Sequence, residues 1–172
     1  LRPSFLDDTT AAVELRSLTL DLLQNPGRRS GVAVLYDQDH TEATYSAAEL
    51  LSRIYDKVLI ITPKSSIGTK VNYISLLGVL RRLTKSKIEI ISSSIPCGLS
   101  DGSLRLENVL NGETTSLADV ACLTYSTPRS ADTELRDALK REKFSIDLVG
   151  DCNAPRVMAA AVHEGYQVGL LI

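Results

Sequence analysis

The chain has 172 residues, of which 44% are hydrophobic, and a formal net charge of −2. This length can bury one sizeable core, because a domain of about 150 residues removes roughly 70% of its unfolded surface from water. The negative charge argues against nucleic-acid binding, which needs basic surface, and no apolar run reaches the roughly 18 residues that a membrane span requires.

The three cysteines are Cys97, Cys122 and Cys152. They are odd in number and follow no zinc-ligand spacing, so neither a disulfide framework nor a metal site is expected. Residues 1–10 also lack the basic segment and apolar core of an export signal. We therefore expect free thiols in a reducing cytoplasm.

The first element in chain order is a helix with Ala11, Leu15, Leu18 and Leu22 at helical spacing. Asp7, Asp8 and Thr9 are its candidate caps, and the pattern stops at Asn25-Pro26-Gly27. Residues 1–29 are predicted to form this helix and a linker.

Two continuous apolar runs, 31–37 and 57–63, are typical of strands buried on both faces of a parallel sheet. Residues 41–55 between them show helical spacing, so the segment is predicted to be a βαβ unit. A further helix at 69–83 and a third strand at 87–92 follow. That helix is predicted to turn four residues inward: Val71, Ile74, Leu77 and Leu80.

The apolar period then changes to two. Asp101-Gly102 and Asn111-Gly112 are dipeptides suited to tight turns, and Leu104 and Leu106 alternate with polar residues between them. An antiparallel hairpin or meander is predicted for this part of the chain.

The last elements are predicted as a strand at 119–125, a helix at 133–141, a strand at 146–151 and a helix at 154–170. Pro155 would lie in the first turn of the final helix. The pattern as a whole predicts an α/β fold, a Rossmann-like three-layer sandwich with a parallel sheet and an antiparallel β-hairpin or meander.

The candidate binding motif follows the last predicted strand. A glycine there lets backbone approach a ligand, and a helix start presents free N–H groups to phosphate. Asp151 could accept hydrogen bonds from ribityl hydroxyls, or serve with Asn153 only as a helix cap. Arg129 could meet a nucleotide phosphate or pair with carboxylates. The candidate cofactor-binding residues are Gly150, Asp151, Ala154, Pro155, Arg156 and Arg129.

Residues 148–166, together with 34–37, 47–51, 58–63 and 118–128, resemble the C-terminal part of the trimethylamine dehydrogenase and 2,4-dienoyl-CoA reductase family of NADH:flavin oxidoreductases. The resemblance covers residue 30 to the end. It implies that 30–117 form an NAD(P)H-type Rossmann-like domain. It also implies that 118–172 form the C-terminal half of an FAD- or ADP-type domain, whose glycine-rich half would precede Leu1.

In that family an N-terminal TIM barrel carries FMN and substrate, and a cysteine-rich segment holds a 4Fe-4S cluster. The resemblance therefore implies that this chain carries no catalytic residue, that FAD or ADP binds here weakly, and that the barrel domain is its partner.

The loop at 37–44 departs from a working dinucleotide site, because it contains no glycine where GxGxxG is expected. Its carboxylates Asp37, Asp39 and Glu42 would repel pyrophosphate. With His40 they could bind a metal, but no distant ligand pair is evident. Lys64, after the second strand, suits either a 2′-phosphate or a solvated surface.

Three side chains near the end of the chain are of types that take part in catalysis. His163 and Glu164 are expected on a helix surface, since no nucleophile accompanies them. Cys152 at a helix start could have a lowered thiolate pKa, but a packed thiol is the preferred interpretation.

Two other functional interpretations remain open. One is a non-catalytic interaction domain for assembly or electron-acceptor docking, and the other is a response-regulator-like module with an acidic pocket at Asp37 and Asp39.

Strands at 120–125 and 146–149 would lack parallel neighbours in half a domain. They are expected either to join the first sheet or to be covered in a homodimer.

Overall fold

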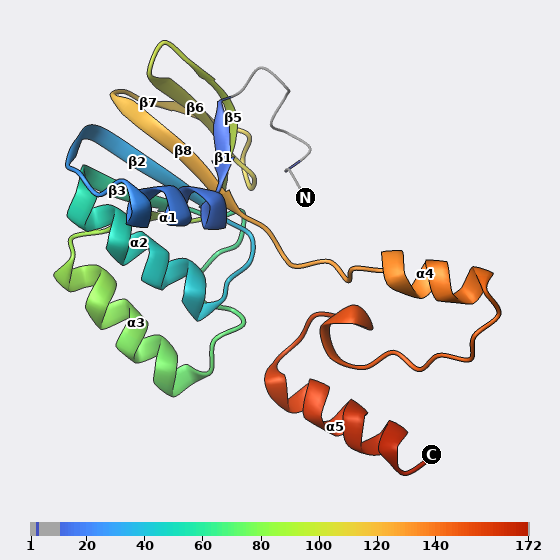
Figure 1. Cartoon of the computed structure of the whole chain (residues 1–172). Helices are drawn as coiled ribbons and strands as arrows, with labels where there is room; N and C mark the ends of the chain where they lie inside the picture. The colour runs from blue at the N-terminus through green and yellow to red at the C-terminus, as the bar shows by residue number, and fades with distance from the viewer. Residues whose placement is uncertain (1–2, 4–10, 172) are drawn as a thin grey trace. The chain divides into compact units, whose positions relative to one another are not determined.

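A computed structural model describes Pro3 and residues 11–171. Its described residues fall into two compact units, which meet in the sequence between Thr127 and Pro128 (Figure 1). None of the described helices is long and apolar enough to cross a membrane. The caps proposed at Asp7, Asp8 and Thr9 lie outside the described residues.

The first unit is built on a five-stranded parallel sheet with the strand order β1-β8-β2-β3-β4. Helices cover one face of this sheet and a second, antiparallel sheet covers the other (Figure 1). The predicted Rossmann-like three-layer fold is confirmed. The strands are β1 (Ala12–Glu14), β2 (Arg29–Asp37), β3 (Tyr55–Ile61), β4 (Glu89–Ile91) and β8 (Val120–Ser126).

The place of β2 in the sheet explains why its residues 31–36 are apolar without interruption. Ala33 and Leu35 lie in the core beneath the helices, whereas Val34 and Tyr36 lie in the core beneath the antiparallel sheet. Successive strand residues point to opposite faces, so a central strand between two cores has no polar side.

Three helices cover the first face: α1 (Leu15–Gln24), α2 (Glu42–Ile54) and α3 (Tyr73–Lys85). Helix α1 begins after β1, and the Glu14 carboxylate caps it by accepting hydrogen bonds from the backbone N–H groups of Arg16 and Ser17 at 2.9 and 3.1 Å. Its predicted inward residues Leu15, Leu18 and Leu22 are all buried. Ala11, predicted on the same stripe, is exposed, because residues 12–14 pair with β8 as a strand where only a helix and a linker were predicted.

Helix α3 differs from its prediction in its first residue and in which of its residues face the core. Asn72 caps it by accepting a hydrogen bond from Ser75 N at 2.9 Å, so the helix begins four residues later than expected. Val71 and Leu80 pack on the core as predicted, but Ile74 and Leu77 are exposed, which corrects that part of the prediction. Val79 and Leu83 are buried instead, because only the later turns of α3 lie over the core.

The antiparallel sheet is the predicted meander, formed by β5 (Ser94–Ser100), β6 (Ser103–Asn108) and β7 (Thr114–Leu117). Asp101 and Gly102 both adopt positive φ angles, 50° and 72°, as a tight hairpin turn requires. Leu104 and Leu106 bury their side chains against the parallel sheet.

Strand β8 lies between β1 and β2 in the parallel sheet. The segment 120–125 has therefore joined the first sheet, one of the two expected outcomes. The compact units consequently divide at 127/128, ten residues beyond the division at 117/118 proposed from the sequence. The assignment of 1–29, 30–117 and 118–172 to domain types stays a prediction.

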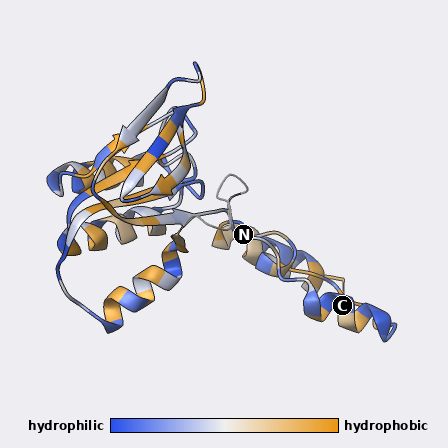
Figure 2. Ribbon diagram, turned by 90° about the horizontal axis from the view of Figure 1, so that it is seen from above, coloured by the Kyte–Doolittle hydropathy of each residue, from blue (hydrophilic) through white to orange (hydrophobic). Residues whose placement is uncertain are grey.

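The second unit contains α4 (Glu134–Arg141), a 3-10 turn (Gly150–Cys152) and α5 (Met158–Gly169). The strand predicted at 146–151 is wrong, because the unit offers it no parallel neighbour to pair with. The final helix begins at Met158, so Pro155 precedes it. No residue of 128–171 is buried, and its helices carry both apolar and polar residues (Figure 2).

Candidate functional site

The carboxyl end of β2 is the position where open α/β sheets bind their ligands. Here the chain continues without glycine through Gln38, Asp39 and His40 into α2. The Gln38 and Asp39 N–H groups both donate to the Ser126 carbonyl, at 2.8 and 3.1 Å. His40 adopts the left-handed conformation, with φ of 58°. The turn is thus closed by β8 and by a strained histidine.

Asp37 is the centre of a buried polar cluster at this turn. Its carboxylate accepts hydrogen bonds from His40 N at 2.8 Å and from the Tyr45 hydroxyl at 2.7 Å. The Tyr45 oxygen in turn accepts from Gly68 N at 2.5 Å. Burial, and then the Asp37 carboxylate, raise the pKa of Tyr45, so its hydroxyl stays a donor.

The His40 side chain is fully buried beside Asp37. Its Nδ1 lies 3.4 Å from Asp37 Oδ2, but the alignment is not that of a hydrogen bond, and this nitrogen has no hydrogen-bond partner among the described residues. Nε2 lies 3.5 Å from the Thr62 hydroxyl. Burial lowers the pKa of His40 against the opposing effect of Asp37, which favours a neutral ring.

Side chains therefore occupy the place of a pyrophosphate cradle. Asp39 also accepts from the Thr41 hydroxyl and lies 3.8 Å from Lys70. The described residues contain no group of three or more His, Cys, Asp or Glu arranged to hold a metal ion. Lys64 is exposed and donates to the Thr69 hydroxyl at 3.1 Å, which agrees with a solvated surface lysine.

The predicted cofactor-binding residues all lie in the second unit, around the turn before α5. Arg129 pairs with Asp151 at 2.9 Å and donates to the Arg156 carbonyl at 3.5 Å. Gly150 has φ of 67°, and Ala154 and Pro155 follow it half-buried. The structure brings the set together, with two guanidinium groups at one turn, a donor arrangement that suits a phosphate.

Glu164 connects the parts of this turn, a role that the sequence analysis did not predict because it expected Glu164 on a helix surface. Its carboxylate accepts from Gly150 N at 2.7 Å and from the Asn153 amide at 3.2 Å, and it pairs with Arg156. Glu164 lies on the same half-buried face of α5 as Ala161 and Val168. That spacing was the only signal for its role.

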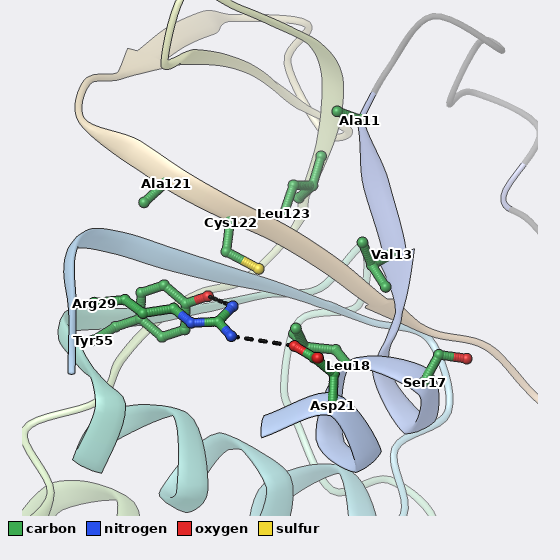
Figure 3. Close-up of a pocket in the computed structure, with 10 residues that line it drawn as sticks. All are labelled: Ala11, Val13, Ser17, Leu18, Asp21, Arg29, Tyr55, Ala121, Cys122 and Leu123. Atoms are coloured by element: carbon green, nitrogen blue, oxygen red, sulfur yellow. Dashed lines mark hydrogen bonds and ion pairs between the residues drawn. The ribbon is translucent and has the colours of Figure 1, made fainter. Parts of the chain in front are cut away.

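A cavity of about 340 Å³ opens in the first unit, between α1 and the first residues of β2 and β8 (Figure 3). The Arg29 guanidinium lies along its wall and donates hydrogen bonds to the Asp21 carboxylate at 3.1 Å and to the Tyr55 hydroxyl at 3.4 Å. Burial raises the pKa of the Cys122 thiol on the same wall, so this cysteine stays protonated. Nothing in the sequence pattern indicated this cavity.

The fold recurs in solved structures of redox enzymes. The 6-hydroxypseudooxynicotine amine oxidase from Pseudomonas geniculata N1 matches with a TM-score of 0.78 and 21% identity, over 94% of this chain and 24% of that one. Histamine dehydrogenase from Rhizobium sp. 4-9 matches at 0.74 and 20%, over 94% and 26%. A 2-naphthoyl-CoA reductase matches at 0.76 and 18%, over 100% and 25%.

No protein-family model and no curated protein sequence matches the chain. The chain spans about a quarter of the length of the three enzymes named above. The resemblance inferred from the sequence is confirmed at the level of the fold, for this chain has the Rossmann-like α/β fold of a segment that the amine oxidase, histamine dehydrogenase and 2-naphthoyl-CoA reductase share.

Proposed function

We propose that the chain is the C-terminal nucleotide-binding region of a flavin-dependent oxidoreductase of the trimethylamine dehydrogenase type, and that it carries no redox chemistry itself. One observation carries this proposal. Nearly the whole chain superposes on about a quarter of each of three large redox enzymes. By this proposal FMN and a 4Fe-4S cluster belong to other parts of the parent enzyme, including its TIM barrel.

We place the nucleotide at the turn of Gly150–Cys152 and at Arg156, and we propose FAD or ADP as its identity. Arg129 and Arg156 supply positive charge at exposed positions, where each pairs with a carboxylate, Asp151 or Glu164, that a phosphate would compete with. No side chain caps the N-terminus of α5. That helix start leaves N–H groups and a positive dipole for a phosphate. Glu164 would hold Gly150 in the conformation that brings its backbone towards the ligand.

The loop at 37–44 is not the proposed nucleotide site. Three carboxylates stand there, and the buried side chains of Asp37 and His40 fill the turn. A pyrophosphate would have to displace hydrogen bonds that the chain already makes to itself, and unpaired buried groups are costly. We therefore expect NADH and NADPH to bind more weakly than ADP or FAD.

An NMR titration of the intact chain with ADP, FAD, NADH and NADPH tests this proposal. Shift changes are expected at Gly150, Asp151 and Arg156, and Arg129→Ala should weaken the binding of ADP by about tenfold, the equivalent of one charge-assisted hydrogen bond. Arg136→Ala is the matched control, since Arg136 is another second-unit arginine paired with an aspartate. Shifts confined to 38–44 would contradict the proposed site.

A second candidate function is a non-catalytic interaction domain that forms a homodimer or docks an electron acceptor. Its support is the apolar surface of α5, where Met158, Val162 and Tyr166 are more than half exposed. Absence of any shift with all four nucleotides, with a dimer seen by sedimentation, would favour it over the first proposal. The three free thiols accord with the cytoplasmic location that we propose in either case.

A further inference from the structure

Residues 62–72 form the loop that joins β3 to α3, and two sides of the first unit hold it. At its start, Ser93 N donates to the Lys64 carbonyl at 2.8 Å and Ser94 N to the Thr62 carbonyl at 2.9 Å. At Gly68 it is tied to α2 by the hydrogen bond to Tyr45. At this point of the loop the Tyr45 hydroxyl supplies the hydrogen bond to α2, next to the buried side chain of Ile67.

The Tyr45 hydroxyl and His40 Nδ1 both lie close to the same oxygen of Asp37. The Tyr45 hydroxyl donates to Oδ2 at 2.7 Å, and His40 Nδ1 lies 3.4 Å from that oxygen without a hydrogen bond. The other carboxylate oxygen, Oδ1, already accepts from His40 N. In the tautomer whose proton is on Nε2, facing the Thr62 hydroxyl, a proton added to Nδ1 has Oδ2 as its acceptor. The ring or the carboxylate has to turn for that hydrogen bond to form.

The charges around the ring come from three elements. Asp37 at the end of β2 and Asp39 in the next loop favour the protonated imidazole, whereas Lys64 and Lys70 of loop 62–72 oppose it. Tyr45 of α2 and Thr62 after β3 contribute only neutral groups. Burial outweighs these charges, so near neutral pH the ring is neutral and the Tyr45 bond is intact.

We propose that Asp37, His40 and Tyr45 form an acid-sensitive latch, in which protonation of His40 draws Asp37 Oδ2 from the Tyr45 hydroxyl and loosens loop 62–72 at Gly68. A hydroxyl that donates to a carboxylate is polarised and becomes a better acceptor. When Tyr45 loses Asp37, its oxygen holds Gly68 N less strongly.

The latch lies at the carboxyl edge of the sheet, where ligands of such folds bind. Release of the loop would open that edge, and the inference does not depend on nucleotide binding by the second unit.

The test is amide exchange of Gly68 in the intact chain between about pH 5 and pH 8, corrected for intrinsic exchange, with NMR titration of the His40 ring. Protection of Gly68 is expected to fall about tenfold as the ring becomes protonated, with the same midpoint. The amide of Ile88, which donates to the Leu83 carbonyl, should show no such step.

Two substitutions sharpen the test. His40→Asn should remove the pH step, since asparagine tolerates a positive φ but does not titrate. His163→Asn, which changes the other histidine of the chain, should keep it. Tyr45→Phe should leave Gly68 weakly protected at every pH. The latch would be overturned if amide protection of Gly68 in the unsubstituted chain did not change while the His40 ring titrates. It would also be overturned if the pH step in protection persisted in His40→Asn. The first of these outcomes does not depend on any variant being folded.

Discussion

Residues 11–127 and residues 128–171 both form helices with apolar side chains, but only the first unit buries such side chains in a core. In the first unit, Leu35, Ile60 and Leu104 are completely buried between layers. In the second, α4 and α5 are helices in the two segments where helices were predicted, yet Phe144, Met158 and Leu171 are each more than 60% exposed. Helices can therefore be read from local pattern, whereas a core requires a second layer to cover it.

The largest expected difference between the two regions is in amide exchange of the intact chain. Amides of Leu35 and Ile60 should exchange only through global unfolding, and those of Val162 and Tyr166 through local opening. The protection factors should differ by at least about a thousandfold, given the usual stability of a domain. Equal protection, lost on dilution, would instead reveal a dimer that covers α5.

A matched pair of leucines sharpens the comparison at the level of single side chains. Leu35→Ala removes a fully buried side chain and should lower the free energy of unfolding by about 2–5 kcal/mol. Leu170→Ala removes one that is 67% exposed and should change it by no more than about 0.5 kcal/mol. Urea denaturation followed by circular dichroism measures both. A comparable loss for Leu170→Ala would mean that α5 packs against a partner.

The smallest effect concerns the two histidines, one in each unit. Burial lowers the pKa of His40 in the folded chain, so the unfolded chain binds a proton first as pH falls. Stability should be fully present above about pH 6.5 and decline as pH drops towards the lower folded pKa. His40→Asn should flatten this part of the pH profile. His163→Asn, a change at an exposed position of α5, is the control.

Much of the candidate site was also visible in the sequence. The predicted residues Arg129, Asp151 and Arg156 do lie together around Gly150. Glu164 was missed because its partners are a backbone N–H and an amide that only a folded turn brings to it. The Tyr45 to Gly68 bond was missed for the same reason, since 23 residues separate its two ends.

The sequence by itself determined the parallel strands β2, β3, β4 and β8, the meander and its turns, because apolar runs and Asp-Gly or Asn-Gly pairs are local signals. It did not show strand β1. Tertiary structure alone decided three other points. It placed β8 beside β2, turned Val79 and Leu83 of α3 inward in place of Ile74 and Leu77, and left 146–151 without a strand. Each of these depends on which strand is present to pair with, or which layer is present to cover an apolar face. The local sequence pattern does not contain that information, because the neighbouring element lies far away in the sequence.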